Sequence, residues 1–202
     1  MQILFIHGGM TFKKKESYIE YLKNRPISLE KRNDWSDKFL DEKFPNIQII
    51  RPSMPLKDYA KYKDWKIFFE RYLTLLEKEF ILIGKSLGGI FLAKYLSENR
   101  LPKKAVSTFL VCAPFDDSIP TEDLAGGFEL KNNLSLIHEN TDKLHLLFSE
   151  DDDVVPVEHA EKFKKKLPNA DIRVYKEKNG HFKISEFPEI VDLIKEDLKQ
   201  KN

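Results

Sequence analysis

The sequence predicts an α/β fold, a three-layer α/β/α sandwich around a six-stranded, mostly parallel sheet. Short apolar runs of strand length alternate along the chain with helix-length amphipathic segments, which is the pattern of consecutive βαβ units. Most of these runs are continuously apolar, as is typical of strands covered by helices on both faces. The strands are expected at residues 2–7, 47–52, 80–84, 106–113, 144–149 and 172–177.

Amphipathic segments between and after these runs predict the helices of the outer layers. They are expected at residues 34–44, 64–79, 86–99, 132–139, 157–167 and 186–199. Asn33 or Asp34 can cap the first of these helices, and Pro156 can open the fifth at its first turn. Two long connections remain. The connection between the first two strands is expected to contain an extra short helix within residues 13–25, and residues 114–131 are expected to border a binding site.

The composition is that of one globular domain over residues 1–202, with no separate cap domain. Lys and Arg number 34 against 33 Asp and Glu, and the resulting formal charge of +1 favours neither a nucleic-acid partner nor an anionic membrane surface. The single cysteine, Cys112, excludes an internal disulfide and lies in an apolar run, where we expect a buried thiol rather than a nucleophile. The first apolar run is too short for a signal peptide, and no run is long enough for a membrane helix. A cytoplasmic monomer or homodimer is expected.

The segment Gly84-Lys85-Ser86-Leu87-Gly88 matches G-x-S-x-G between an expected strand and an expected helix. Such an abrupt turn holds its central residue in a strained backbone conformation and leaves no room for side chains two positions to either side. The hydroxyl of Ser86 is thereby raised out of the sheet edge. It lies at a helix N-terminus, where unpaired N–H groups and the helix dipole favour developing negative charge. The motif therefore predicts a nucleophilic serine.

A second glycine pair, Gly8-Gly9, follows the first strand, where a loop can bring a backbone N–H group to the serine. Acyl transfer needs such donors, because the tetrahedral intermediate carries negative charge on the former carbonyl oxygen and each donor contributes about 3 to 4 kcal/mol. We expect the N–H groups of Leu87 and Gly9 to be the two donors, with Met10 as the alternative to Gly9. His7 is expected to brace the glycine loop.

A weak nucleophile such as serine needs a base, and five histidines are available. His181 is the expected base, because it lies in a loop between the last strand and the last helix. Catalytic groups gather at this carboxyl edge of open α/β sheets. By contrast, His138 and His159 fall on expected helices, and His145 lies in or beside a strand.

An acid must then orient the imidazole and stabilise its positive form. Four carboxylates at residues 150–153 follow the fifth strand, again at its carboxyl end. We expect Asp152 to be the acid, with Asp151 as the alternative, and the remaining carboxylates to be solvated. Asp116 and Asp117, after the fourth strand, are a less favoured location.

The motifs HGG, GKSLGG, DDDVVP and NGHF follow one another along the chain. In these motifs the chain resembles an α/β-hydrolase, and it is similar to the small cap-less serine hydrolases of the retinoblastoma-binding-protein-nine-like type. The resemblance implies a minimal α/β-hydrolase fold, without the two antiparallel strands that usually precede the oxyanion strand. It also implies hydrolysis of carboxylic esters or thioesters through an acyl-enzyme. In that reaction Ser86 attacks, His181 takes and returns the proton, and Asp152 orients His181.

This chemistry calls for no metal or organic cofactor, and the scattered histidines, with no Cys/His cluster, indicate no metal site. His7, Phe115 and Phe182 are expected to line a pocket roofed by residues 114–131 and by aromatic residues of the segment 10–32. We expect short acyl chains or small amphipathic esters as substrates rather than long-chain lipids. Two alternatives stay open: a catalytically silent binding or scaffold protein with this fold, and an acyltransferase with an acceptor other than water.

Overall fold

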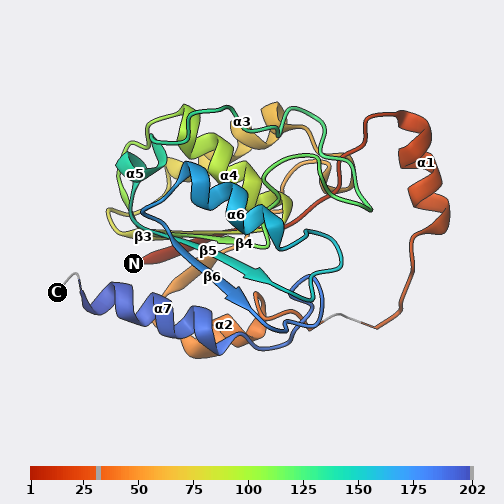
Figure 1. Ribbon diagram of the computed structural model, residues 1–202. Coiled ribbons are helices and arrows are strands. Elements are labelled where there is room, and N and C mark those ends of the chain that lie inside the picture. Colours follow the sequence, from red (N-terminus) through yellow and green to blue (C-terminus); the bar gives the residue numbers. More distant parts are fainter. Residues whose placement is uncertain (31–32, 201–202) are drawn as a thin grey trace.

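The computed structural model describes residues 1–30 and 33–200, and a six-stranded sheet forms its centre (Figure 1). The order of strands across the sheet is β2-β1-β3-β4-β5-β6, and every neighbouring pair is parallel. The predicted fold class is confirmed, with a sheet that is wholly parallel. The strands are β1 Gln2–Ile6, β2 Gln48–Ile50, β3 Phe80–Lys85, β4 Ala105–Val111, β5 Thr141–Ser149 and β6 Asp171–Tyr175.

Helices cover both faces of this sheet, with α3, α4, α5 and α6 on one side and α2 and α7 on the other (Figure 1). No helix of the described residues is long and apolar enough to cross a membrane. The helices are α1 Lys15–Asn24, α2 Lys38–Lys43, α3 Tyr62–Leu73, α4 Leu87–Glu98, α5 Ile137–Asn140, α6 Glu158–Lys166 and α7 Pro188–Lys199, with a 3₁₀ turn at Lys57–Tyr59.

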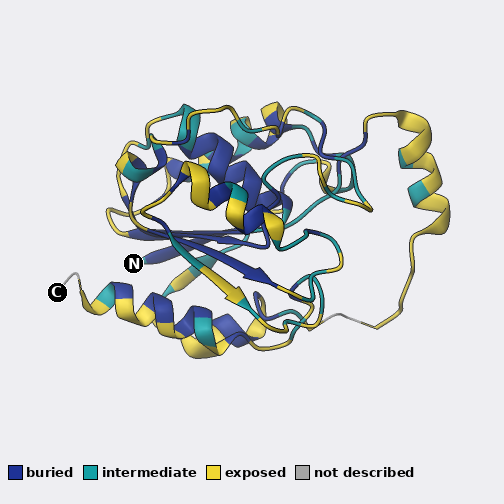
Figure 2. Ribbon diagram, viewed as in Figure 1, coloured by how far each residue is buried: buried dark blue, intermediate teal, exposed yellow. Residues whose placement is uncertain are grey.

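Two hydrophobic clusters fill the spaces between the sheet and its helices. The first includes Trp65, Phe69 and Phe91 and lies under α3 and α4. The second includes Trp35 and Phe187 and lies under α2 and α7. Figure 2 shows the consequence for the helices, since α4 is buried along most of its length whereas α7 alternates buried and exposed faces. The central strands β1, β3 and β4 are buried along nearly their whole length because both of their faces meet these clusters, whereas the edge strands β2 and β6 are partly exposed.

The start of α2 differs from its prediction for a local reason. Neither Asn33 nor Asp34 caps α2, which begins only at Lys38. Asp34 instead accepts hydrogen bonds from the N–H and the hydroxyl of Ser36 and forms an ion pair with Lys85. Such a local side-chain turn competes with the helix and delays its start.

Two other helices are also shorter than predicted. The third helix stops at Leu73, because the next residues must carry the chain down to β3 while Leu76 stays buried in the core. The helix expected at residues 132–139 is reduced to the four residues of α5, which begins only at Ile137, after a local turn in which Asn133 Oδ1 accepts the N–H of Ser135. Pro156 lies just before the N-cap of α6, and its carbonyl accepts a hydrogen bond from the N–H of His159.

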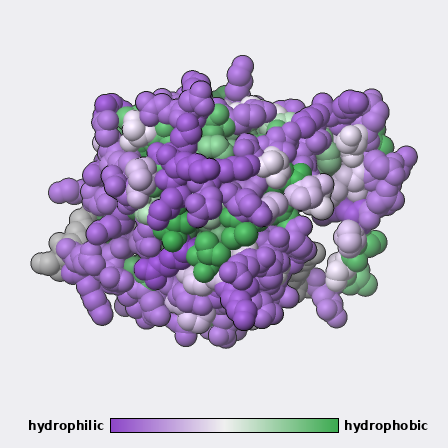
Figure 3. All heavy atoms as spheres, viewed as in Figure 1, coloured by the Kyte–Doolittle hydropathy of each residue, from purple (hydrophilic) through white to green (hydrophobic). Residues whose placement is uncertain are grey.

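The expected extra helix is present as α1, which extends away from the body of the molecule (Figure 1). It is attached through the aromatic rings of Tyr18 and Tyr21, which pack on Phe12. Its remaining surface and the segment after it are exposed. Figure 3 shows a largely hydrophilic face, with a hydrophobic area at the segment that follows α1, where Ile27 and Leu29 are exposed.

The sheet order reverses at β1, which has β2 on one side and β3 on the other. The strand register places Ile6 beside Gly84 and Lys85 beside Val111. The loops that leave β1, β3 and β4 therefore start next to one another at the carboxyl edge of the sheet. Ligands bind at such a switch point in open α/β sheets, so this edge is the place to look for a site.

Candidate active site

Ser86 occupies the sharp turn between β3 and α4, with φ 56° and ψ −122°. The two flanking glycines are required by close approach of the backbone. A Cβ atom on Gly84 would lie 2.4 Å from the carbonyl oxygen of Gly88, and one on Gly88 would lie 2.2 Å from the carbonyl oxygen of Ile6. The strain and the packing expected for G-x-S-x-G are therefore both present. The N–H of Ser86 donates to the carbonyl of Val111 at 2.8 Å, which ties the turn to β4.

The glycine loop after β1 lies against this turn. A Cβ atom on Gly8 would be 3.2 Å from Cβ and 3.7 Å from Oγ of Ser86, so the loop approaches the serine hydroxyl. The N–H of Met10 donates to the carbonyl of Lys57 at 2.7 Å and is thus already engaged. Leu87 is the first residue of α4, where a backbone N–H has no partner within the helix.

His7 braces the glycine loop as expected. Its Nε2 accepts a hydrogen bond from the N–H of Met54 at 2.9 Å, and its Nδ1 contacts the carbonyl oxygen of Gly8 at 2.5 Å. Burial lowers the pKa of His7, although the bond to Gly8 acts in the opposite direction. A neutral ring with its proton on Nδ1 satisfies both contacts.

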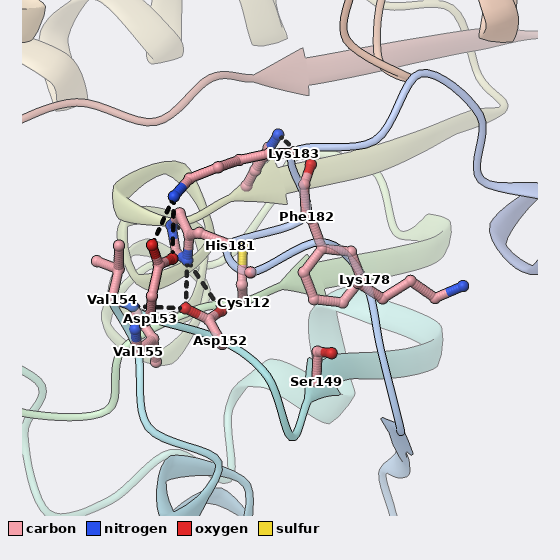
Figure 4. Close-up of polar contacts among 12 residues, drawn as sticks. Cys112, Ser149, Asp152, Asp153, Val154, Val155, Lys178, His181, Phe182 and Lys183 are labelled. Carbon is pink, nitrogen blue, oxygen red and sulfur yellow. Dashed lines mark hydrogen bonds and ion pairs between the residues drawn. The ribbon is translucent and has the colours of Figure 1, made fainter. Parts of the chain in front are cut away.

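His181 and Asp152 are joined directly. Nδ1 of His181 lies 2.9 Å from both carboxylate oxygens of Asp152 (Figure 4). The side chain of Asp152 is only 2% exposed, and its Oδ1 also accepts the N–H groups of Val154 and Val155 at 2.9 and 2.8 Å. The loop after β5 thus fixes the carboxylate, and the carboxylate fixes the imidazole. A donor at Nδ1 leaves Nε2 of the neutral ring as a proton acceptor.

Asp151 and Asp153 take different positions from Asp152. Asp151 accepts the N–H groups of Lys178 and Gly180 at 2.9 and 2.8 Å and the hydroxyl of Ser149. Burial opposes ionisation of Asp151, but these hydrogen bonds outweigh it and lower its pKa. The expectation that the carboxylates other than Asp152 are solvated is therefore wrong for Asp151, which fastens together the loops after β5 and β6. Asp153 is exposed.

Cys112 also contacts the His181 ring, with Sγ 3.8 Å from Nε2 (Figure 4). It is the residue after β4, has a φ of 42°, and is fully buried. The expected buried thiol is confirmed, but its contact with His181 could not be read from the sequence. Burial lowers the pKa of His181, and the Cys112 sulfur and the Asp152 carboxylate outweigh this effect and raise the pKa above its ordinary value.

Ser86 and His181 line one cavity of about 710 Å³. In the described part of the chain, no hydrogen bond joins the Ser86 hydroxyl to Nε2 of His181, whose polar contact there is the Cys112 sulfur. Free enzymes often hold such contacts long until substrate arrives. The other residues lining the cavity are Phe5, His7, Gly8, Gly9, Met10, Asn33, Asp34, Ser36, Lys57, Lys85, Glu122 and Lys183.

Sequence reasoning missed the charged residues of this cavity. Glu122 comes from the long connection after β4, which was expected to border a binding site, but no motif marks that residue. Burial raises the pKa of Glu122 above its ordinary value. Two of the lysines are neutralised locally, since Lys85 pairs with Asp34 at 2.6 Å and Lys183 with Asp153 at 2.7 Å.

Two expected pocket residues lie outside this cavity. The ring of Phe182 is fully buried in the cluster under α7, where it contacts Phe187. Phe115 packs against Phe163 of α6, and its N–H donates to Nδ1 of His159 at 2.8 Å. The expectation that Phe115 and Phe182 line the pocket is therefore wrong. The ring of Phe182 packs in the core under α7, and the ring of Phe115 packs against α6.

The other acids and histidines considered as catalytic residues make contacts away from Ser86. Asp116 is held by Lys162 at 2.8 Å, and Asp117 accepts the N–H of Leu124 at 2.6 Å. His145 lies between Asp171 and Asp197, each 2.9 Å away, and His138 belongs to α5. None of these acids and histidines is among the residues that line the cavity of Ser86 within the described chain.

A cysteine, an aspartate and a histidine that are far apart in the sequence lie close together in the structure. Cys112, Asp152 and His181 each offer a metal-ligating atom, and these atoms lie within 4.8 Å of one another. The three residues are far apart in the chain, so their spacing gave no indication of this cluster.

Comparison with solved structures identifies the fold. The product of the ydeN gene of B. subtilis matches with a TM-score of 0.74 at 18% identity, over 98% of each chain. Mouse alpha/beta hydrolase domain-containing protein 10 matches with a TM-score of 0.63 at 16% identity, over 100% of this chain and 90% of that one. The Pyrococcus furiosus esterase Pf2001 matches with a TM-score of 0.60 at 18% identity, over 98% of this chain and 80% of that one.

At these identities the likeness establishes the fold, and the fold is that of an α/β-hydrolase. A family model described as serine hydrolase matches residues 30–195, a range that contains Ser86, Asp152 and His181. Because this match covers most of the chain, the protein belongs to the serine hydrolase family. Membership in this family supports a hydrolase activity.

Proposed function

We propose that the protein hydrolyses small carboxylic esters or thioesters through an acyl-enzyme on Ser86. The observation that carries the proposal is the hydrogen-bonded pair of Asp152 and His181 in the cavity that Ser86 also lines. The chain order is also that of α/β-hydrolase triads. The serine lies on the strained turn after β3, the aspartate follows β5 and the histidine follows β6.

The first half of the proposed reaction forms the acyl-enzyme. Oγ of Ser86 attacks the carbonyl carbon of the ester while Nε2 of His181 takes the hydroxyl proton. Asp152 holds Nδ1–H and stabilises the imidazolium that results. Collapse of the tetrahedral intermediate expels the alcohol or thiol, which receives the proton from His181.

The second half returns the enzyme to its starting state. Water attacks the acyl group, His181 accepts one of its protons and then returns it to Oγ of Ser86, and the carboxylic acid leaves. In both halves the developing oxyanion needs two N–H donors. We assign Leu87, at the start of α4, and Gly9, in the loop that abuts Ser86. Met10 is less suited, because its N–H is bound to Lys57.

The cavity favours small substrates in this proposal. Charged side chains of Asp34, Lys57, Lys85, Glu122 and Lys183 are among the residues that line it, so a long alkyl chain would desolvate some of these groups. The esterase among the similar structures is consistent with ester substrates for this chain.

Labelling with a fluorophosphonate tests the proposal. Intact-mass analysis should show one adduct on the wild type, no adduct on Ser86→Ala, and slower labelling of His181→Ala, whose serine lacks its base. The far-ultraviolet circular dichroism of each variant serves as the control for folding. A well-folded wild type that forms no adduct would favour a silent binding protein. An adduct without hydrolysis of any ester, but with transfer to an added alcohol, would favour an acyltransferase.

A further inference from the structure

Ser86 and His181 share no hydrogen bond among the residues that the structure describes, so their relative position depends on contacts between their two loops. Lys85, the residue before Ser86, makes such a contact. Its Nζ donates to the carbonyl oxygen of Phe182, the residue after His181, at 3.0 Å. We propose that Lys85 is a positioning residue, which holds the loop of His181 against the turn of Ser86 through this carbonyl. This role rests on the proposed function, in which His181 is the base.

The loop of His181 has a backbone that needs to be held. Asn179, Gly180 and Phe182 have φ angles of 53°, 69° and 50°. This left-handed region costs free energy for every residue with a Cβ atom, and such a conformation persists only where surrounding contacts fix it. The N–H of Phe182 donates to the carbonyl of Gly180 at 2.7 Å, which places His181 at the centre of a three-residue turn. Asp151 holds the first part of this turn through the N–H of Gly180.

The part of the loop after His181 is held by a buried ring and by two bound carbonyls. The ring of Phe182 is fully buried under α7, which fixes its side chain. Burial of the ring does not fix the orientation of the peptide group that follows Phe182, and its carbonyl is the acceptor for Lys85. Two residues further on, the carbonyl of Ile184 accepts the N–H of Trp35 at 2.9 Å. Lys85 therefore fixes the backbone next to the base.

The ammonium of Lys85 is itself fixed. The side chain is only 14% exposed, and Nζ forms an ion pair with Asp34 at 2.6 Å. Asp34 is held in turn by the N–H and the hydroxyl of Ser36. Nζ of Lys85 also lies 5.8 Å from the centre of the Trp35 ring. A lysine with these contacts can hold a carbonyl in place, whereas a solvated surface lysine cannot.

The contact matters for catalysis because Lys85 is bonded directly to the nucleophile. Lys85 ends β3, so its ammonium and the Ser86 hydroxyl start from adjacent residues of one rigid turn. Proton transfer requires the base within hydrogen-bond reach of the hydroxyl, and small displacements lower the rate strongly. Loss of the contact should reduce the fraction of molecules in which His181 is in place. Such a change lowers kcat and affects the KM of a small neutral ester little.

Lys85→Met removes the ammonium from a side chain of similar length and tests the role. We expect kcat for p-nitrophenyl acetate to fall about ten-fold or more, with KM within about three-fold of the wild type. The ratio of variant to wild-type kcat should be the same at every pH, because the position of His181 and not its protonation has changed. A loss that lies in KM, or a ratio that approaches one as the pH changes, would overturn the proposal.

Lys178→Met is the matched control. The Lys178 side chain is 12% exposed, and its ion pair with Glu189 also measures 2.6 Å. Lys178 belongs to the same loop but points away from His181 (Figure 4), and no contact of its Nζ with a backbone carbonyl occurs in the described residues. Both variants should shift the urea midpoint by similar amounts, yet Lys178→Met should keep kcat within about three-fold of the wild type. Equal losses of kcat would indicate general destabilisation and refute the role of Lys85.

Restoring the ammonium separates its loss from misfolding. Lys85→Cys is alkylated with 2-bromoethylamine, which gives a side chain of nearly the same length that again ends in an ammonium. Lys85 lines the cavity, so the reagent can reach the new thiol, whereas Cys112 is fully buried. Intact-mass analysis should show one adduct, and kcat should return to within about three-fold of the wild type. A singly alkylated protein whose kcat stays at the level of Lys85→Met would overturn the proposal.

Hydrogen exchange reports on the loop without any hydrolysis. Amides of residues 180–186 should exchange about three-fold or more faster in Lys85→Met than in the wild type or in Lys178→Met. Unchanged exchange would refute the attachment of the loop by Lys85, even if hydrolysis fell. A wild type that hydrolyses no ester, together with faster exchange in Lys85→Met, would refute the proposed function and leave the attachment standing.

Discussion

Asp151 and Asp152 are neighbours in the sequence with opposite roles in the structure. Asp152 faces His181, whereas Asp151 binds the backbone N–H groups of Lys178 and Gly180. The difference arises because successive side chains of the loop point in different directions. Asp153, the next residue, reaches the surface and pairs with Lys183. Three consecutive acidic residues thus have three roles. Asp152 binds the imidazole, Asp151 joins the loops after β5 and β6, and Asp153 forms an ion pair at the surface.

Replacing Asp151 by alanine should destabilise the protein by about 1–3 kcal/mol, because two backbone donors lose their acceptor. The rate of ester hydrolysis should fall as well, since the loop that carries His181 loses its attachment. Asp153→Ala is the matched control, and loss of its exposed ion pair should cost no more than about 1 kcal/mol. Urea unfolding and kcat of both variants give the comparison. Equal effects of the two substitutions would contradict the assigned role of Asp151.

The pH dependence of hydrolysis should reflect the environment of His181. A general base acts when it is deprotonated, so kcat/KM rises as pH increases through the pKa of the base. Cys112 and Asp152 together raise that pKa, so the midpoint of the rise should lie above the ordinary histidine value of about 6.5. Cys112→Ala removes one of the two causes and should move the midpoint to lower pH. A midpoint that stays in place in Cys112→Ala would show that the sulfur does not influence the base.

At the scale of elements, the turn between β3 and α4 requires two glycines, and each of them makes room for a different backbone carbonyl. Gly84 makes room for the carbonyl of Gly88, and Gly88 makes room for the carbonyl of Ile6 in β1. The second contact is between elements, because it sets how closely the start of α4 approaches β1. The position of the serine hydroxyl over the sheet follows from this packing.

Gly88→Ala should therefore reduce stability and hydrolysis together, since a new Cβ would lie 2.2 Å from the carbonyl oxygen of Ile6. Gly127→Ala is a useful contrast. Gly127 has φ 86°, but the nearest atom to a new Cβ there is 3.6 Å away, so the substitution carries only a backbone penalty of about 1–2 kcal/mol. Thermal unfolding should show the larger loss for Gly88→Ala. A smaller loss than in Gly127→Ala would mean that the turn can relax.

Local patterns predicted the elements of this site but not all of its contents. The strand-to-helix glycines identified Ser86, and the loop positions of His181 and Asp152 followed from strand ends. The three residues lie at one edge of the sheet because the carboxyl ends of parallel strands meet there. The contact of Cys112 with His181 depends on strand order and on a left-handed backbone at residue 112, neither of which has a sequence signature. Glu122 reaches the cavity through a long connection without regular structure.

Across the whole molecule, the cavity lies where the sheet order reverses, and its walls come from distant parts of the chain. Met10, which precedes α1, and Asn33, which follows it, both line the cavity. The long connection after β4 adds Glu122. Since these segments place charged groups in the cavity that Ser86 lines, we expect the proposed esterase to favour polar or short acyl groups.

Hydrolysis of a series of p-nitrophenyl esters should show this selection. The value of kcat/KM should be higher for acetate and butyrate than for palmitate, because a long chain would leave charged side chains of the cavity poorly solvated. The esters are compared below the concentration at which palmitate aggregates. A marked preference for palmitate would contradict the charged character assigned to the substrate site.

The most direct test of the central claim is to trap the acyl group on its residue. The enzyme is mixed with p-nitrophenyl acetate, quenched with acid within one turnover, digested and examined by mass spectrometry. We predict an acetyl group on Ser86 in the wild type and none at that position in Ser86→Ala, with turnover lost in the variant. An acetyl group on another residue, or undiminished hydrolysis by Ser86→Ala, would contradict the role of Ser86 as the nucleophile.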